Sequence, residues 1–527
     1  MHAHRRVCLQ RIVSTLSCVM AAACGGDGPT RPGAVPGLHV VAGGGLTDSI
    51  YAVSPQALVV EVRRANGKVA AGVEVLFQAQ PHADSSRGSF AGMAVCTIVL
   101  AHCIYSSEPG TNNATQTVDS TDSNGRARAT VQNGFIAGRG VIRILVPALG
   151  LTDSATYTVT RGAAFRLRVS SSDTAAIIGT TVQLRAAVED RAGNARDDAI
   201  LWRISGSSSS ISVDASGGRV DGRAFGTGVV LASAGTFSDS AVIRVVPRAR
   251  FLVWAPASEV VRLIDSDGAA SRDVLNGIAT QLGVFPRFDP SRGQITAFRS
   301  GSFIGPTTLE QTDTLGTSRH PIADGRGFAL IIAARLLADG TLLMVARKQN
   351  EADKALWRVD ANGVASRLVT LPGLEYGSIY GGADISPDGS RVAYVYVSPS
   401  AGTSELRVVN VSTGAANTVA PLARTPRRSP DGSRLAYLLP AIPFYEELNG
   451  VAMVVNADGT DRRALGAPVF LPGITWSPDG AYILGGLRDE PNGPAMRMVR
   501  VSDGADVQLK FRTRTGELQR YYQPDWR

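Results

Sequence analysis

Histidine, cysteine and paired carboxylates are the residues that most often carry acid–base, nucleophilic or metal chemistry. Between residues 250 and 527 the chain has one histidine, His320. A single histidine leaves only one candidate for a Ser-His-Asp triad and too few ligands for a multi-histidine metal site. No Gly-x-Ser-x-Gly, His-Glu-x-x-His or Gly-x-x-x-x-Gly-Lys motif accompanies it. We therefore expect a protein that is not an enzyme and that holds no cofactor and no metal.

Aspartates recur at one position of a repeated phrase, Ser-Pro-Asp-Gly, as Asp388, Asp431 and Asp479. Proline presets the second position of a tight turn, aspartate suits the third, and glycine takes the left-handed position that closes it. We interpret these aspartates as turn residues rather than ligands. Carboxylate pairs for glycoside hydrolysis leave no local signature, so a carbohydrate-active enzyme is the alternative. It requires two carboxylates about 5–10 Å apart across a channel mouth.

The N-terminal residues 1–23 have the pattern of an export signal, with a basic start and an apolar stretch too short to span a membrane. The stretch ends Met20-Ala21-Ala22-Ala23-Cys24, which resembles a bacterial lipobox. The resemblance implies that Cys24 is lipidated and that the chain is anchored in a bacterial envelope. An ordinary secretory signal cleaved nearby is the alternative. Residues 24–37 are predicted to form a flexible tether.

Cys96 and Cys103 are the only possible internal cysteine pair of the mature chain. They lie in one long loop, and an oxidising compartment would let them form a disulfide. A zinc site would need two more ligands, and no paired spacing with His82 or His102 supports one.

The elements that position these residues repeat along the second half of the chain. The three Ser-Pro-Asp-Gly phrases are spaced 43 and 48 residues apart, and each precedes an apolar strand. These are the spacings of propeller blades. A second series of turns, each closed by glycine, recurs at 268, 316, 363, 414, 459 and 504. Six such turns predict six blades.

The two ends of this region are predicted to complete one blade together. The C-terminal run 523–527 has the pattern of the strand that precedes a Ser-Pro-Asp-Gly turn, and no later strand follows it. The blade that begins at Phe251 lacks such a strand. Pairing of the C-terminal strand with the blade that begins at Phe251 would remove the free edges of the sheets.

Two segments of short alternating strands precede the repeats, at about 38–161 and 164–247. The strand 72–77, the turn 122–125 and the ending Asp-Ser-Ala at 153–155 resemble bacterial immunoglobulin-like domains of the invasin and intimin type. The second segment repeats that ending 86 residues later, at 239–241, and resembles the second major group of such domains. Trp202 is predicted to fill the core between its two sheets. Asp122 and Asn124 lack the downstream glutamate of a calcium loop, so we predict a hairpin turn.

Composition fits a globular protein that does not bind nucleic acid. The chain has 527 residues, of which 44% are hydrophobic and 19% are charged, and it contains 57 glycines. The net charge of +8 comes almost entirely from arginines spread evenly along the chain. A nucleic-acid footprint would be a clustered basic stripe.

The repeats over 250–527 resemble the TolB-type, WD40-like β-propeller. The resemblance implies a disc of six blades around a central channel, with the most variable loops on one face. Exposed aromatic and acidic residues on such loops are candidate partner contacts. They are Tyr376, Tyr380, Phe444, Tyr445, Glu446 and Glu447.

We thus predict an all-β protein: two immunoglobulin-like β-sandwiches followed by a six-bladed β-propeller, closed by its C-terminal strand. Its expected function is that of an envelope-anchored binding or adhesion lipoprotein, whose propeller recognises a protein or a glycan. A structural envelope spacer without a ligand is a further alternative.

Overall fold

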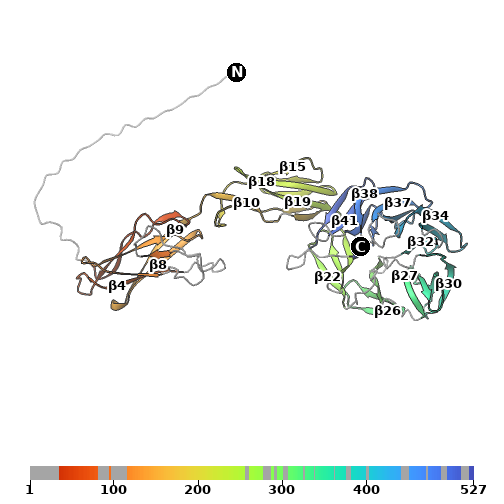
Figure 1. The fold of residues 1–527 in the computed structure, drawn as a ribbon, viewed down its shortest axis with the longest axis horizontal. Helices are drawn as coiled ribbons and strands as arrows, with labels where there is room; N and C mark the ends of the chain where they lie inside the picture. Colours follow the sequence, from red (N-terminus) through yellow and green to blue (C-terminus); the bar gives the residue numbers. More distant parts are fainter. Residues whose placement is uncertain are drawn as a thin grey trace, which may run out of the picture. The chain divides into compact units, whose positions relative to one another are not determined.

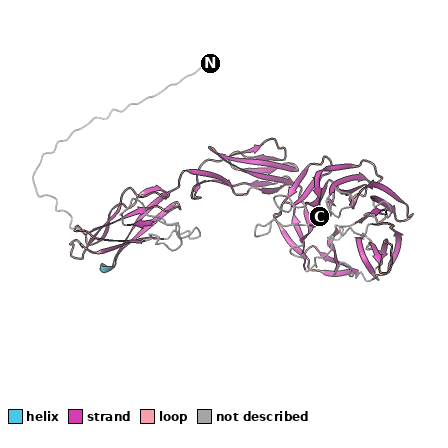
Figure 2. Ribbon diagram, in the orientation of Figure 1, coloured by secondary structure: helices cyan, strands magenta, loops and turns pink. Residues whose placement is uncertain are grey.

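The computed structural model describes residues 35–80, 94–96, 116–171, 173–255, 260–276, 287–289, 293–300, 307–323, 327–337, 339–360, 362–374, 382–398, 403–440, 450–470, 473–487, 495–511 and 522–526. Within these ranges the chain is built from β-strands, with one short 3₁₀ helix at Pro147–Leu149 (Figure 2). The all-β prediction is confirmed. No helix in the described ranges is long and apolar enough to cross a membrane.

The chain divides into two compact units. The first comprises residues 1–164 and 189–196, and the second comprises 165–188 and 197–527 (Figure 1).

The first unit contains two sheets that face each other across an apolar core. One sheet has the order β1-β3-β7-β5 and the other β2-β9-β8-β4-β6. The strands are β1 (Gly37–Ala42), β2 (Thr47–Ser49), β3 (Leu58–Arg63), β4 (Glu74–Ala79), β5 (Ala94–Cys96), β6 (Gln116–Ser120), β7 (Arg126–Gln132), β8 (Gly138–Val146) and β9 (Leu151–Thr160). Strand β2 pairs in parallel with the last strand, β9.

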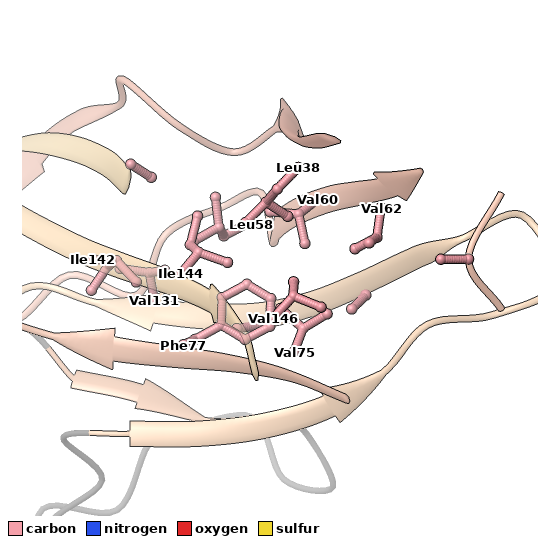
Figure 3. Close-up of a cluster of buried hydrophobic side chains, with 14 of the residues drawn as sticks. Leu38, Leu58, Val60, Val62, Val75, Phe77, Val131, Ile142, Ile144 and Val146 are labelled. Carbon is pink, nitrogen blue, oxygen red and sulfur yellow. The ribbon is translucent and has the colours of Figure 1, made fainter. Parts of the chain in front are cut away.

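Strict alternation of side chains builds this core. In β3, Leu58, Val60 and Val62 are buried while the residues between them are half-buried. They meet Phe77 of β4 and Ile144 of β8 across the sandwich (Figure 3). The residues at Asp122 form a tight turn, in which the Asp122 carboxylate accepts hydrogen bonds from the amides of Asn124 and Arg126. The predicted hairpin is wrong, because the turn joins β6 of one sheet to β7 of the other.

The second unit begins with a smaller set of sheets. One sheet has the order β11-β19-β18-β15 and another β12-β17-β16, with β11 parallel to β19. Trp202 of β15 is buried, as predicted. Of the strands from Ala164 to Val246, β14, the end of β13 and the first residue of β10 belong to the first unit. The strands are β10 (Ala164–Val169), β11 (Asp173–Ile177), β12 (Thr181–Gln183), β13 (Ala186–Asp190), β14 (Ala195–Arg196), β15 (Leu201–Ser205), β16 (Ile211–Val213), β17 (Arg219–Gly222), β18 (Gly226–Ala234) and β19 (Phe237–Val246).

The rest of the second unit is a β-propeller, in which four-stranded antiparallel meanders (blades) surround a common centre (Figure 1). The first blade has the order β22-β21-β20-β43, and the next ones are β23 to β26, β27 to β30, β31 to β34, β35 to β38 and β39 to β42. The last two join into one sheet through a pair between Phe470 and Leu487. Strand β43 pairs antiparallel with β20, which places Trp526 opposite Phe251.

The strands of the first three blades are β20 (Arg250–Ala255), β21 (Val260–Asp265), β22 (Ser271–Asn276), β43 (Tyr522–Trp526), β23 (Arg287–Asp289), β24 (Gln294–Ser300), β25 (Thr307–Asp313), β26 (Arg319–Ala323), β27 (Phe328–Leu336), β28 (Leu342–Lys348), β29 (Ala355–Val359) and β30 (Ala365–Thr370). Those of the remaining blades are β31 (Ala383–Ile385), β32 (Arg391–Val397), β33 (Ser404–Asn410), β34 (Ala416–Pro421), β35 (Arg424–Arg428), β36 (Arg434–Pro440), β37 (Gly450–Asn456), β38 (Arg463–Phe470), β39 (Thr475–Trp476), β40 (Tyr482–Leu487), β41 (Ala495–Arg500) and β42 (Asp506–Leu509).

The Ser-Pro-Asp-Gly phrases form the predicted turns. In the first of them the Ser386 hydroxyl donates to the Asp388 carboxylate at 2.5 Å and accepts from the Arg391 amide at 2.9 Å. The other two turns repeat this arrangement. Hydrogen bonds from Ser386 and Ser390 lower the pKa of Asp388 to about 2. The glycines of the second series, at 268, 316, 363, 414, 459 and 504, all have φ between 73° and 92°.

Within the second unit, the sandwich packs against the sheets where the propeller closes. Phe225 lies against Tyr482, with ring centroids 4.9 Å apart, and the Arg500 guanidinium lies 5.5 Å from the Phe225 centroid. Phe225 shares one apolar cluster with Phe251 and Trp526. This sandwich therefore buries the joint between the two ends of the propeller.

Candidate functional site

The innermost strands of the propeller surround its centre. Strand β31 contacts β27 and β35, β39 contacts β35 and β43, and β43 contacts β23. These strands come from every described blade, and all but β27 are short, so the few side chains that point inward decide what the centre can bind. All of them except β43 precede a turn of the Ser-Pro-Asp-Gly kind or its degenerate equivalent, and β43 has the sequence pattern of such a strand.

One position of each inner strand, two residues before the turn, contributes to a ring of polar side chains. The strand register supports the equivalence, since Asp384 pairs with Ala393, Arg427 with Ala436 and Thr475 with Leu484. We call this set the ring residues. They are Arg287, Arg335, Asp384, Arg427, Thr475 and Asp525.

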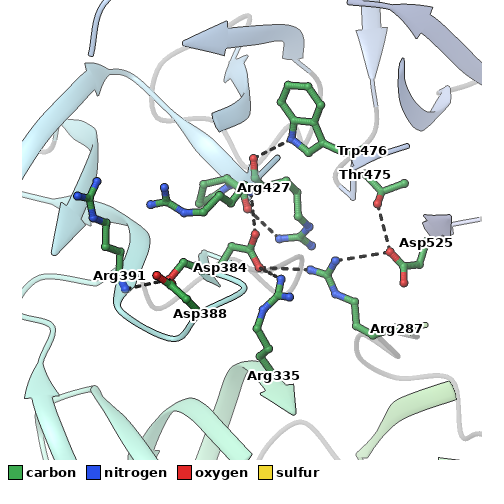
Figure 4. Close-up of polar contacts among 12 residues, drawn as sticks. Arg287, Arg335, Asp384, Asp388, Arg391, Arg427, Thr475, Trp476 and Asp525 are labelled. Carbon is green, nitrogen blue, oxygen red and sulfur yellow. Dashed lines mark hydrogen bonds and ion pairs between the residues drawn. The ribbon is translucent and has the colours of Figure 1, made fainter. Parts of the chain in front are cut away.

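Asp384 is buried between two of the ring arginines (Figure 4). Its Oδ1 lies 3.7 Å from Nη2 of Arg287 and 3.9 Å from Nη2 of Arg335. Its Oδ2 accepts a 2.8 Å hydrogen bond from the amide of Arg428. Burial opposes ionisation, but these neighbours and Arg427 outweigh it, and the pKa of Asp384 lies below its ordinary value.

Asp525 is held in the same way on the opposite side of Arg287 (Figure 4). Its Oδ1 lies 3.6 Å from Nη1 of Arg287 and accepts a 3.2 Å hydrogen bond from the Thr475 hydroxyl. Its Oδ2 accepts a 2.6 Å hydrogen bond from the amide of Phe288. One guanidinium therefore bridges carboxylates that are 141 residues apart in the sequence (384 to 525).

Arg427 differs from Arg287, because its charge has no counterion of its own. Its side chain is 6% exposed, and its Nη1 donates to the carbonyl of Pro426 at 3.0 Å. Among the described residues, no carboxylate lies within ion-pair distance of its guanidinium. Its main-chain carbonyl accepts a 3.0 Å hydrogen bond from the Trp476 indole. Burial and the neighbouring Arg287 lower the pKa of Arg427 to about 10, so it remains a cation at neutral pH.

The ring residues open onto a cavity of about 340 Å³. The prolines of the three Ser-Pro-Asp-Gly turns, Pro387, Pro430 and Pro478, line it, and so do Leu336 and Trp526. The cavity thus combines a charged ring with apolar walls. A few convergent polar groups in an otherwise apolar cavity are typical of a small-ligand site.

The cavity combines an excess of positive charge with a carboxylate whose pKa is lowered. With Arg428, which also lines the cavity, four guanidinium groups face two carboxylates, which leaves two positive charges in excess. A general acid needs a raised pKa, whereas the pKa of Asp384 is shifted downward. No group of three or more His, Cys, Asp or Glu side chains in the described part of the chain is arranged to hold a metal ion.

The site residues predicted from the sequence lie mostly outside the described ranges. These are Cys24, Cys103, Tyr376, Tyr380, Phe444, Tyr445, Glu446 and Glu447. Cys96 ends β5, where its backbone pairs with Thr130, and its side chain is not described. The contact loops, the lipidation site and the disulfide therefore stay predictions.

Sequence reasoning missed the ring residues, although a signal was present. The position two residues before each turn is polar or charged in every repeat, although most of these inner strands are otherwise rich in apolar residues. Aligning the turns and reading that position would have named the whole ring.

Comparisons with known proteins add only remote similarities. No family model matches the chain, and no curated protein matches it. Solved structures that resemble it include TolB from Acinetobacter baumannii (15% identity, 64% of this chain and 83% of that one, TM-score 0.41). Putative TolB from Agrobacterium tumefaciens (13% identity, 53% and 98%, TM-score 0.34) and an oligogalacturonate lyase in complex with manganese (17% identity, 51% and 76%, TM-score 0.34) are similar in the same way. At these values the activities of those proteins do not transfer to this chain.

Proposed function

We propose that this chain is a lipid-anchored recognition protein of a bacterial envelope and not an enzyme. In this proposal the lipid is attached to Cys24, two immunoglobulin-like sandwiches carry the head, and the head is a six-bladed, TolB-type propeller that binds a protein or a glycan. The observation that carries the proposal is the character of the propeller cavity. It is lined by fixed charges that suit binding, and its buried carboxylate has a lowered pKa.

The arrangement of the sandwiches and propeller supports the roles of carrier and head. Both sandwiches pair an early strand in parallel with their last strand, β2 with β9 and β11 with β19. In the second unit, Phe225 of the sandwich packs in one apolar cluster with Phe251 and Trp526 of the propeller. This contact fixes the propeller to the sandwich, which suits a domain that must present one face to a ligand.

A carbohydrate-active enzyme is supported less well. It would have to use Asp384 and Asp525, the carboxylates of the cavity, and both lie against Arg287. A spacer without a ligand would have no need for a buried cation that lacks a counterion, because such a group costs stability.

Metabolic labelling tests the anchor directly. Bacteria that express the full chain are fed an alkyne-tagged fatty acid, and the labelled protein is detected after membrane fractionation. We expect the wild type to carry the label in the membrane fraction. We expect Cys24→Ser to lose the label and Cys18→Ser, the matched control, to keep it. Equal labelling of the wild type and Cys24→Ser would overturn the proposed anchor.

A further inference from the structure

We infer that the propeller cavity is a binding site for one organic carboxylate with an apolar body, and that Arg427 is the residue that holds it. The inference rests on the proposed recognition function and names the chemistry of the ligand. It begins with the state of the arginine itself.

Arg427 is a buried cation with unused hydrogen-bonding capacity. A guanidinium has five N–H donors, and the contact that Arg427 makes is the one from Nη1 to the carbonyl of Pro426. Its side chain is 6% exposed and lines the cavity. A buried charge without a partner is unfavourable, so a site of this kind is completed by an anion.

The protein's own carboxylates near the cavity are already engaged. Asp384 faces Arg287 and Arg335 and accepts a hydrogen bond from the Arg428 amide. Asp525 faces Arg287 and accepts hydrogen bonds from Thr475 and Phe288. Both are therefore held toward Arg287, and neither moves to Arg427 without giving up these contacts.

Charge and shape select the anion. The ring residues and Arg428, which also lines the cavity, together hold four guanidinium groups and two carboxylates, and this excess of positive charge favours an anion. A planar guanidinium binds a carboxylate through two parallel hydrogen bonds, a geometry that a point charge does not provide. A carboxylate is the common organic anion with this shape.

The walls of the cavity select what is attached to the carboxylate. Pro387, Pro430 and Pro478 offer ring carbons, and Leu336 adds an aliphatic surface. The polar side chains beside them are already used, because Thr475 bonds Asp525 and the Trp476 indole bonds Arg427. Within the described part of the propeller, Arg428 keeps its Nε and Nη2 without a hydrogen-bond partner, and these donors add to the attraction for an anion rather than offering acceptors to sugar hydroxyls. A volume of about 340 Å³ accommodates a ring on a short chain.

The test uses the full chain and a pair of probes that differ only in charge. Isothermal titration calorimetry measures binding of 4-phenylbutyrate and of its neutral amide, 4-phenylbutanamide. We expect one site, with the carboxylate bound at least tenfold more tightly than the amide. We expect Arg427→Gln to weaken carboxylate binding at least tenfold, Arg427→Lys to weaken it less, and Arg358→Gln, an exposed arginine of β29, to leave it unchanged.

Several outcomes would overturn the inference. Equal binding of the carboxylate and the amide by the wild type would be one such outcome. This comparison needs no variant, so it decides the question even if Arg427→Gln fails to fold. Wild-type affinity in a folded Arg427→Gln protein would remove Arg427 from the site. Tighter binding of galacturonate than of phenylbutyrate would refute the apolar body, and equal competition by sulfate would refute the choice of a carboxylate. The fatty-acid label on Cys24 is read separately, so failure here leaves the proposed anchor standing.

Discussion

Trp526 packs edge to face against Phe251, with ring centroids 5.0 Å apart and ring planes at 83°. These residues lie 275 positions apart (251 to 526), near the two ends of the propeller sequence. Both are buried, and they share an apolar cluster with Phe511 and Tyr482. The contact links the joint of the propeller to the strand that carries Asp525 into the ring.

Truncating this contact should destabilise the propeller strongly. Trp526→Ala removes a buried aromatic side chain, and we expect it to lower the free energy of unfolding by about 3–5 kcal/mol. Chemical denaturation followed by tryptophan fluorescence and circular dichroism measures the change. Val364→Ala, at a position that is 64% exposed, is the control and should change stability by less than about 0.5 kcal/mol. Equal effects of the two substitutions would refute the importance of the joint.

Alanine substitutions at two glycines of the second turn series distinguish the energetic cost of a positive φ from the cost of a steric clash. Gly363 and Gly316 have nearly the same φ, 78° and 76°. A Cβ at Gly363 meets nothing within 4 Å, whereas one at Gly316 would lie 2.3 Å from the carbonyl oxygen of Val274. Gly363→Ala should therefore cost about 1–2 kcal/mol, and Gly316→Ala a further ~1–3 kcal/mol. Thermal denaturation compares them, and equal costs would contradict the close approach of Gly316 to Val274.

Neutralising Asp384 should disrupt the ring. Asp384→Asn removes the negative charge beside the buried Arg427 and one of the two carboxylates that hold Arg287, and we expect a loss of about 3–5 kcal/mol at neutral pH. Asp353→Asn, at an exposed position of the same propeller, is the matched control and should be close to neutral. Urea denaturation of the two variants gives the difference. A change below about 1 kcal/mol for Asp384→Asn would show that the network contributes little.

The turn aspartates should make the free energy of unfolding depend on pH in the acidic range. The pKa values of Asp388 and Asp431 are lowered to about 2 from the ordinary 3.8 by serine hydroxyl groups. A lowered folded-state pKa stabilises the fold above the unfolded pKa, and that contribution is lost as the pH falls from about 4 to about 2. The double variant Asp388→Asn, Asp431→Asn should thus lose stability at pH 7, by about 1 kcal/mol or less per turn because both are largely exposed. The difference from the wild type should vanish near pH 2, and a difference that is constant from pH 2 to 7 would contradict this assignment.

The packing contact between the second sandwich and the propeller depends on Phe225. Phe225→Ala removes the ring that lies against Tyr482 and beneath Arg500. We expect faster proteolysis at the Pro247–Ala249 link, which is held by hydrogen bonds to Ser266. Leu201→Ala, at an exposed position of β15, should leave the cleavage rate unchanged. Identical digestion of wild type and Phe225→Ala would argue that the two parts are held by other contacts.

The sequence by itself determined the local structure of this protein. Turn chemistry at Ser386, Asp388 and Gly389 and alternation in the strand of Leu58, Val60 and Val62 are properties of neighbouring residues. They predicted the turns, the strands and the all-β class, because short-range hydrogen bonds and side-chain burial are set by residue type and spacing.

Only the tertiary structure decided which polar residues act together. Arg287, Asp384, Arg427 and Asp525 lie far apart in sequence, each in its own short strand, and their shared position in the repeats does not say which of them are in contact. They meet because the blades surround one centre and β43 returns to β20, so that Arg287 lies between two carboxylates and Arg427 is left without one. Burial and charge balance depend on that arrangement in space, and so the candidate site could be read from the fold but not from any segment of the chain.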